Sequence, residues 1–191
     1  MKKTALILCL IILLAGCSSG MRIPDDEAME VINGLLPLSN EVNEIIFGKG
    51  LPAVDEAYES EHTGTAYYPV KEGTGYSSIA DIKRAAEKVY SRSYLDAVYK
   101  TAFEGVSGGD SVLGSLSPRY TEIAGVLKVN VSAEGFDIRS YEKVTECRYA
   151  SSGKGYAIYA CKALASDGKT YDIKIYLTQQ SGEWRLDSPT Y

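Results

Sequence analysis

Side chains that could carry out acid–base or nucleophilic chemistry are sparse in this sequence of 191 residues. His62 is its single histidine, with the hydroxyl residues Ser60 and Thr63 close by. A metal site with several imidazole ligands needs more than one histidine, and a serine-type triad cannot be built around this one. His62 is either a base for Ser60 or Thr63 or a solvated loop histidine, and we expect the second. We predict no catalytic residues.

Four carboxylates, those of Asp55, Glu56, Glu59 and Glu61, make the segment before His62 acidic. Calcium prefers such oxygen ligands, but the known calcium loop has alternating ligand positions around a central glycine, and this segment lacks that spacing. We therefore expect a solvated acidic surface, no metal site and no cofactor. If the protein binds another protein, this segment is the element that we expect to enter the partner's cleft.

The remaining candidate residues lie in a C-terminal meander whose turns predict its register. Asp167-Gly168 and Ser181-Gly182 are preferred two-residue hairpin turns. Directly opposed residues share one face, which we take as the core face because the set is mostly apolar. The predicted pairs are Leu164 with Tyr171, Ala160 with Ile175, Ile158 with Leu177, and Leu177 with Leu186.

Cys147 and Cys161 fix the register of the preceding hairpin when they are placed opposite each other. This choice also pairs Glu146 with Lys162, as an ordinary cross-strand ion pair. Opposed strand residues have Cα atoms roughly 4.5–5.5 Å apart, which is within disulfide range. We expect a disulfide, and two free cysteines on one sheet face remain the alternative. The further pairs in this register are Val144 with Leu164 and Tyr149 with Tyr159.

The same register places Tyr149, Tyr159 and Tyr176 side by side on the face opposite the core, with Asp187 next on the fourth strand. Such a row offers flat apolar rings with hydroxyl groups at the rim, which suits recognition of a peptide or a sugar. The alternative is that another segment covers the rings and makes a second small core.

Two helical stretches precede the meander. Acidic residues at 25–27 and an apolar repeat at helical spacing predict a helix that ends near Ile46, and Pro37 is expected to kink or split it. A second helix is predicted from Ile79 to about Phe103, capped by Ser77 or Ser78 and broken near residues 91–93. Short strands are expected at 65–70, 127–131 and 136–141.

Helices followed by an antiparallel meander predict an α+β fold, with the N-terminal helices packed on a curved C-terminal sheet. The layout resembles the cystatin-like and nuclear-transport-factor-two-like folds. More specifically, the order of a helix, the Tyr67-Tyr68 strand, the segment 82–94 with Lys88-Val89-Tyr90 and the meander resembles secreted inhibitors of peptidoglycan DL-endopeptidases. The resemblance implies a protein partner in the cell envelope.

The N-terminal residues have the pattern of a targeting signal. Leu14-Ala15-Gly16-Cys17 resembles the lipobox of bacterial lipoprotein precursors, and it follows Lys2, Lys3 and an apolar run at 5–14. That run is too short to span a bilayer but has the length of a signal-peptide core. The resemblance implies removal of residues 1–16 and acylation of Cys17. Residues 17–24 would be a short tether and 25–191 a single domain, held at the extracytoplasmic face of the cell membrane, or at the outer membrane if the host has two.

Charge limits the partners. Residues 17–191 carry 18 Lys and Arg against 25 Asp and Glu, which argues against nucleic acid and against electrostatic attraction to anionic lipid. Contact with the bilayer should come from the acyl chains on Cys17. We expect a lipid-anchored protein-binding module, which could act as an inhibitor or regulator of a peptidoglycan hydrolase. The alternatives are an enzyme or small-ligand binder with a pocket in the curved sheet, and a structural lipoprotein without specific affinity.

Overall fold

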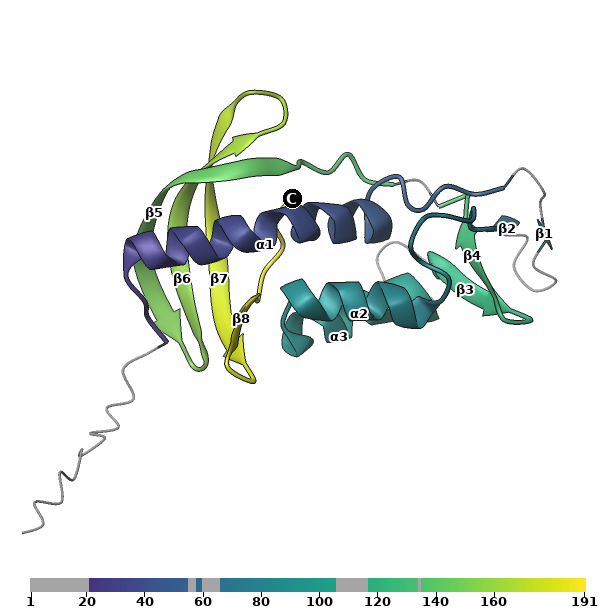
Figure 1. The fold of residues 1–191 in the computed structure, drawn as a ribbon, viewed down its shortest axis with the longest axis horizontal. Helices are drawn as coiled ribbons and strands as arrows, with labels where there is room; N and C mark the ends of the chain where they lie inside the picture. Colours follow the sequence, from purple (N-terminus) through teal and green to yellow (C-terminus); the bar gives the residue numbers. More distant parts are fainter. Residues whose placement is uncertain (1–20, 55–57, 60–65, 106–116, 134) are drawn as a thin grey trace, which may run out of the picture.

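The computed structural model describes residues 21–54, 58–59, 66–105, 117–133 and 135–191. The predictions for the signal peptide, Cys17, Asp55, Glu56, Glu61 and His62 lie outside these residues. The elements, shown in Figure 1, are α1 (Asp25–Ile46), β1 (Tyr58–Glu59), β2 (Ala66–Pro69), α2 (Ile79–Val89), α3 (Arg92–Tyr99) with a π-helical turn (Lys100–Glu104), β3 (Tyr120–Ile123), β4 (Val126–Asn130), β5 (Tyr141–Gly153), β6 (Tyr156–Ala165), β7 (Thr170–Gln180) and β8 (Glu183–Leu186).

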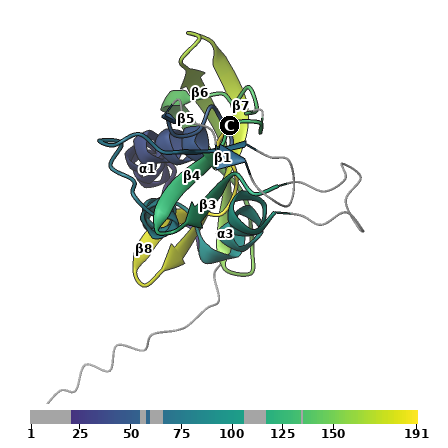
Figure 2. The ribbon, with the colours of Figure 1, turned by 90° about the vertical axis from the view of Figure 1, so that its right-hand side faces the viewer.

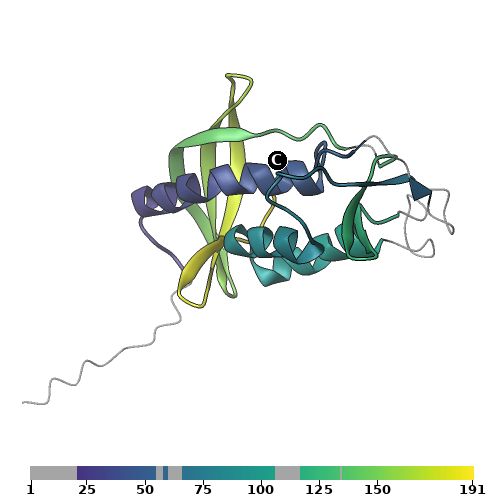
Figure 3. The same cartoon turned by 45° about the vertical axis from the view of Figure 1, so that its right-hand side comes forward.

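The fold is α+β, as predicted. Strands β5-β6-β7-β8 form an antiparallel meander that curves around α1, and α2 and α3 lie beside the other half of α1 (Figure 1). A second antiparallel sheet, in the order β1-β2-β4-β3, closes the far end of the molecule (Figures 1 and 3). This second sheet and its strand β3 were not foreseen. None of the helices in the described part of the chain has the length and apolar character of a membrane span.

The predicted strand at 136–141 is wrong. Residues 136–140 are irregular, and β5 begins only at Tyr141. The backbone N–H of Phe136 donates to the carbonyl of Phe47, just after α1, instead of to a strand. Phe136 is 72% exposed, so its side chain does not supply the buried face that a strand at this position would need.

Helix α1 continues through Pro37 and does not split. Proline removes one backbone donor, so the helix must be held by tertiary contacts on both sides of residue 37. Ile32 and Leu36 are fully buried before it, and Val42 is 1% exposed after it. Burial of this apolar face against the sheet outweighs the lost hydrogen bond.

Side chains of α1 also bind the edge strand β5. Asn33 donates to the carbonyl of Val144 (3.0 Å) and accepts from its N–H (2.7 Å), and Asn40 does the same with Tyr141 (2.8 and 3.3 Å). Asp25 accepts from the N–H of Tyr149 (2.9 Å). The pairing of β5 with β6 is irregular directly after Tyr141, Val144 and Tyr149. At each irregularity α1 therefore bonds backbone groups of β5 next to the break in the ladder, which holds the strand on the helix.

The predicted break in the second helix is confirmed. Ser78 caps α2 by accepting from the N–H of Asp81, and Ser91 caps α3 by accepting from the N–H of Tyr94. Between them Tyr90 is buried, and its hydroxyl bonds Ser39 and Asn43 of α1 and Thr190 near the C-terminus. Burial raises the pKa of Tyr90 above its ordinary value. This polar cluster joins α1, the α2–α3 junction and the last residues of the chain.

The register of the β6–β7 hairpin differs from the prediction by one residue. The N–H of Ala165 donates to the carbonyl of Lys169, and the N–H of Gly168 donates to the carbonyl of Ala165. The loop therefore has three residues, with Gly168 in the left-handed region at φ 78°, instead of the two expected. The observed pairs are Ala163 with Tyr171, Tyr159 with Ile175 and Ala157 with Leu177.

A one-residue shift moves every side chain of a strand to the other face. The core face of β6 is therefore made of Tyr159, Cys161 and their alternate neighbours Ala157, Ala163 and Ala165, all buried. The predicted core residues of β6, which are Ile158, Ala160 and Leu164, face the other way. The turn at Ser181-Gly182 and the pair Leu177 with Leu186 are confirmed.

Candidate functional site

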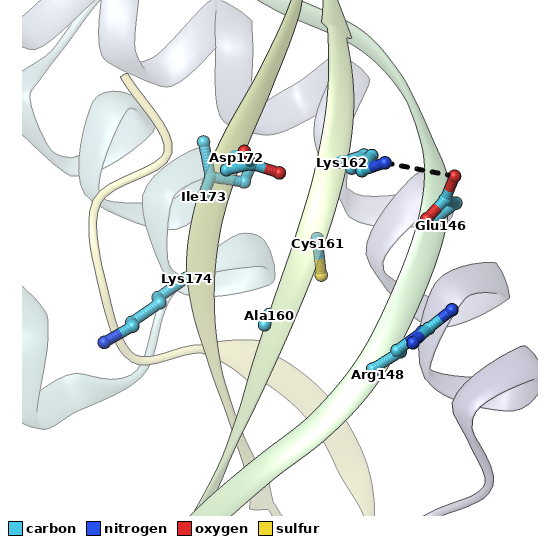
Figure 4. A pocket seen from close by; sticks show the side chains of 8 residues that line it. All are labelled: Glu146, Arg148, Ala160, Cys161, Lys162, Asp172, Ile173 and Lys174. Atoms are coloured by element: carbon cyan, nitrogen blue, oxygen red, sulfur yellow. Dashed lines mark hydrogen bonds and ion pairs between the residues drawn. The ribbon is translucent and has the colours of Figure 1, made fainter.

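A hollow lies on the outer face of the C-terminal sheet, opposite α1. It has a volume of about 720 Å³. Two neighbouring cross-strand rows supply its outward side chains (Figure 4). The first row is Glu146, Lys162 and Asp172, and the second row is Arg148, Ala160 and Lys174.

Ala160 creates the hollow because it is the one small side chain among long ones. Arg148 on β5 and Lys174 on β7 lie on either side of it, and all three are exposed (Figure 4). Neither cation makes an ion pair with a described residue. Both charged side chains point away from Ala160 in this view, so they form a cationic rim on either side of an alanine floor (Figure 4). They can bind a carboxylate or another anion without displacing an internal partner.

The first row is already paired in part. Lys162 Nζ lies 3.5 Å from Glu146 Oε1, and both side chains are about half exposed. This confirms the predicted pair of Glu146 with Lys162 as an ordinary surface ion pair. The predicted pair of Val144 with Leu164 is wrong, because the irregularity between Val144 and Glu146 shifts the register and pairs Val144 with Ala163.

An apolar strip continues the second row toward the β5–β6 turn, where Ile158 pairs with Tyr176 and both are half buried. A ligand or partner thus meets cationic side chains on either side of Ala160 and apolar surface next to them.

The predicted tyrosine row is wrong. Tyr159 is fully buried on the face that packs against α1, and its partner on β7 is Ile175. Tyr149 pairs with Tyr159, as predicted, and their rings meet edge to face with centroids 6.0 Å apart. Tyr176 lies on the outer face instead. The cause is the three-residue β6–β7 loop, which shifts β7 by one position relative to β6.

Cys147 and Cys161 are directly opposite each other, as predicted. Their sulfurs are 3.3 Å apart, and both are free thiols in the structure, so the expected disulfide is not formed there. Both side chains are buried on the α1 face. Cys161 donates to the sulfur of Cys147, and this bond, together with burial, raises the pKa of the Cys161 thiol. The hydrogen bond lowers the pKa of Cys147.

The predicted tether is partly fixed to the sheet. The hydroxyl of Tyr159 accepts from the N–H of Ile23 (3.0 Å) and donates to its carbonyl (2.9 Å). The guanidinium of Arg22 lies over the ring of Tyr149, 4.5 Å from its centroid. The C-terminal end of the predicted tether 17–24 is therefore attached to the folded body through Arg22 and Ile23.

Most of the predicted acidic segment lies outside the described residues. Among its four carboxylate residues only Glu59 lies in the described part of the chain, where its backbone pairs with Ala66. No group of three or more metal-ligating side chains is found among residues 21–54, 66–105 and the later described ranges.

Arg148 and Lys174 were not among the residues expected to form a site, and Ala160 was predicted to lie in the core. Charged residues at alternate positions of β5, β6 and β7 could have indicated an exposed face. They identify one common surface only when the β6–β7 register is known. A comparison of the chain with models of known protein families finds no match, and neither does a comparison with curated protein sequences. Its function must be inferred from its own residues.

Proposed function

We propose that this chain is a membrane-anchored extracytoplasmic lipoprotein that acts as a protein-binding module. The anchoring half of the proposal rests on the lipobox at residues 14–17. The observation that carries the binding half is the uncovered outer face of β5–β7, where Arg148 and Lys174 flank Ala160 without ion-pair partners among the described residues. A partner that presents a carboxylate next to apolar surface would complement this face.

An envelope protein is the partner that the anchor allows, and a peptidoglycan hydrolase is the one that the resemblance favours. In this proposal the protein inhibits or regulates that enzyme. Asp55, Glu56, Glu59 and Glu61 supply the second contact, as an acidic segment that enters the enzyme's cleft.

Photocrosslinking in whole cells tests the binding face. A photoreactive residue at position 160 should capture an envelope protein, because this position is the floor of the hollow. The same residue at Glu30, which is exposed on α1, is the matched control and should not capture that protein. Equal capture from both positions, or capture of nothing from position 160, would contradict the proposed face.

Charge reversal then tests the chemistry of the contact. Arg148→Glu together with Lys174→Glu should abolish the crosslink from position 160, because the two cations bind the partner's carboxylate. Lys143→Glu together with Lys169→Glu makes the same change in net charge outside the hollow and should preserve the crosslink from position 160. If both double variants act alike, the contact depends on net charge and not on this site.

An assay of peptidoglycan hydrolysis tests the hypothesis that the protein is an inhibitor. The purified protein should slow a peptidoglycan hydrolase of the host. Replacing Asp55, Glu56, Glu59 and Glu61 by Ser should weaken the effect and its dependence on salt. No effect on any envelope hydrolase would remove this reading and leave the binding module.

A small-ligand binder is the second candidate. The face of the curved sheet toward α1 is filled by Ile32, Leu36 and Tyr159, so a ligand would have to use the outer hollow. Its volume of about 720 Å³ is in the range of small-molecule pockets. Binding of a small dicarboxylate, measured by calorimetry and lost in the Arg148→Glu, Lys174→Glu variant, would favour this candidate.

A further inference from the structure

The position at which the chain enters the folded body is fixed by specific contacts. Tyr159, which is fully buried, holds both backbone groups of Ile23, and Ile23 itself packs against the core. Arg22 lies on Tyr149, and Asp25 bonds the backbone of the same residue. The chain is therefore attached to β5 and β6 from residue 22 onward.

This attachment leaves little chain between the body and a lipid on Cys17. Ile23 is the sixth residue after Cys17, and a fully extended chain spans at most roughly 3.5 Å per residue, or about 20 Å in all. An acyl group on Cys17 would hold the nearby surface of the body close to the lipid headgroups. The orientation of the domain then depends on which surface lies next to residue 22.

That surface is the edge of the sheet at which β5 turns into β6 and β7 turns into β8. Residues 21–24 lie at this edge, where the described chain begins, as Figures 1, 2 and 3 show. Along β6 the turn is three residues from Tyr159, or about 10 Å at 3.3 Å per residue. The β6–β7 turn lies at the opposite end of the sheet (Figure 1).

The side chains of this edge suit a headgroup layer. Tyr156 and Tyr176 are half buried, and their rings pack with centroids 5.4 Å apart. Gly153 leaves room for Tyr156, because a Cβ there would lie 2.5 Å from its hydroxyl oxygen. Lys154 is exposed at the tip of the turn. Amphipathic tyrosine rings and long cationic side chains are the groups that favour the membrane–water interface.

The edge is close to neutral and not basic. Arg22 and Lys154 are offset by Asp26 and Glu27, which are exposed in the first turn of α1. Attraction to anionic lipid therefore cannot select this orientation. The short attached chain does so, and the tyrosines make the contact favourable.

We propose that the edge formed by the β5–β6 turn, with Lys154, Tyr156 and Tyr176, is the surface that rests on the bilayer headgroups, because the contacts of Arg22 and Ile23 hold it next to the lipid on Cys17. The proposal rests on the proposed acylation of Cys17. It places the second sheet, β1–β4, at the end of the molecule away from the membrane, and it leaves the hollow at Ala160 on a side face.

Two lysines on the ends of one strand provide the test. Lys154 and Lys169 are both exposed, and they occupy the turns before and after β6. The chain 17–191 is coupled through Cys17 to a maleimide lipid in phosphatidylcholine vesicles, with Cys147 and Cys161 buried. Acetylation of each lysine by a water-soluble reagent is then followed by peptide mass spectrometry, on vesicles and for the free protein.

Coupling to the vesicles should slow the acetylation of Lys154 several-fold and leave that of Lys169 unchanged. Including phosphatidylglycerol in the vesicles should change the rate at Lys154 little further, because the edge is close to neutral. A long Gly-Ser linker inserted between Gly20 and Met21 should restore the rate at Lys154. Tyr159→Phe, which keeps the buried ring but frees Ile23, should restore it in part. Equal rates at Lys154 on vesicles and in solution would overturn the proposal, and so would equal slowing of both lysines.

Chemical coupling separates this proposal from the one on which it rests. Mass measurement of the native protein from cell membranes reports whether Cys17 is acylated in the cell. A native protein without acyl chains would refute the anchor, whereas unprotected Lys154 on vesicles would refute the orientation alone.

Discussion

At the scale of the residue, one tyrosine decides how the N-terminal part of the domain is organised. Tyr159 has a fully buried ring and a hydroxyl bonded to both backbone groups of Ile23. Burial raises its pKa above the ordinary value, so it remains a neutral donor and acceptor under physiological conditions. The same residue on the outer face would be a recognition group, and only the pairing with Ile175 places it inside.

The two buried cysteines next to Tyr159 should be able to form a bond. With the sulfurs 3.3 Å apart, a modest movement brings them to the covalent distance of about 2.05 Å. An oxidant such as diamide, which takes up the two electrons and two protons of the thiols, should close the bond. Closing a loop of about 15 residues adds on the order of 3 kcal/mol to the free energy of unfolding by the chain-entropy model. Urea unfolding of oxidised and reduced protein measures the gain, and Cys147→Ser should show none.

Alkylation under denaturing conditions gives the direct answer for the native protein. The protein is purified from the cell envelope without reductant and alkylated. If the chain 17–191 carries two alkyl groups in addition to any on Cys17, the pair stays reduced and the predicted disulfide does not form in the cell.

Asp81 gives the stability of α2 a specific pH dependence. Its carboxylate accepts from the N–H and hydroxyl of Ser77, from the hydroxyl of Ser78 and from Arg84. These bonds, led by the one from the Ser77 backbone, hold the pKa of Asp81 well below its ordinary value of 3.8. A lowered pKa means that the stabilisation is present above the ordinary value and is lost as the pH falls through the lower value of the folded state.

The expected result is a difference between the wild type and Asp81→Asn in the urea midpoint that is largest near neutral pH. It should shrink progressively below the ordinary pKa of 3.8. A difference that stays constant throughout acid titration would show that the carboxylate charge of Asp81 does not contribute to the cap.

At the scale of the element, α1 and β5 are bound through the backbone of the strand. Asn33 and Asn40 are seven residues apart and lie on one face of the helix, and each binds one residue of β5 through both its N–H and its carbonyl. An asparagine side chain has the donor and acceptor of a peptide group, so it replaces a neighbouring strand where the ladder is irregular. The helix thereby covers the sheet edge and limits pairing with other chains.

Asn33→Ala should therefore cost about 1–3 kcal/mol of unfolding free energy, because it leaves the N–H and carbonyl of Val144 without partners. Amide hydrogen exchange at Val144 should accelerate as well. The control is Glu30→Ala at an exposed position of the same helix, for which a change within about 0.5 kcal/mol is expected. Equal effects of the two substitutions would mean that the contact with β5 contributes nothing specific.

A buried arginine ties the end of α1 to the second sheet. Arg119 is 8% exposed and donates to the carbonyls of Gly48 (2.8 Å) and Ala133. Its charge lies at the C-terminal end of the 22-residue helix α1, where the helix dipole favours a cation. Gly50 is required beside it, because a Cβ at residue 50 would lie 2.7 Å from Nη2 of Arg119.

At the scale of the whole molecule, the attached segment 22–24 lies at one end and the second sheet, β1–β4, lies at the other (Figure 1). The end farthest from residue 22 carries the β3–β4 hairpin, whose tip exposes Ile123 and Val126 at 44% and 45%. Exposed apolar side chains on a protruding tip are a feature of contact surfaces. In the proposed orientation this tip and the side-facing hollow would be accessible to other proteins of the envelope.

Removing the acylated residue tests the anchor in the cell. Cys17→Ala should leave the protein unprocessed or release it from the membrane fraction, because no acyl chains can be attached. Cys9→Ala, a cysteine change within the signal peptide, is the control and should leave maturation and membrane association intact. A Cys17→Ala protein that matures normally and still partitions into detergent would refute the anchor.

The features that the sequence determined by itself are those specified by neighbours in the chain. The first helix follows from its acidic first turn and apolar repeat, and the break between α2 and α3 follows from the capping serine at residue 91. The turn at Ser181-Gly182 was also predicted, because a short turn fixes the pairing of the strands it joins. The register of β5 with β6 was set by placing Cys147 opposite Cys161, and this opposition is confirmed.

Only the tertiary structure decided which face of β6 is buried. Asp167-Gly168 is compatible with a two-residue and a three-residue loop, and the choice shifts the pairing of β6 with β7 by one residue. The longer loop buries Tyr159, Cys161 and the three alanines of β6 on the face toward α1 and leaves Lys162 exposed. Sequence-local preferences do not encode this choice. The hollow at Ala160 follows from the same choice, as does the attachment of Ile23. The candidate site could not be predicted because it is made by long-range packing.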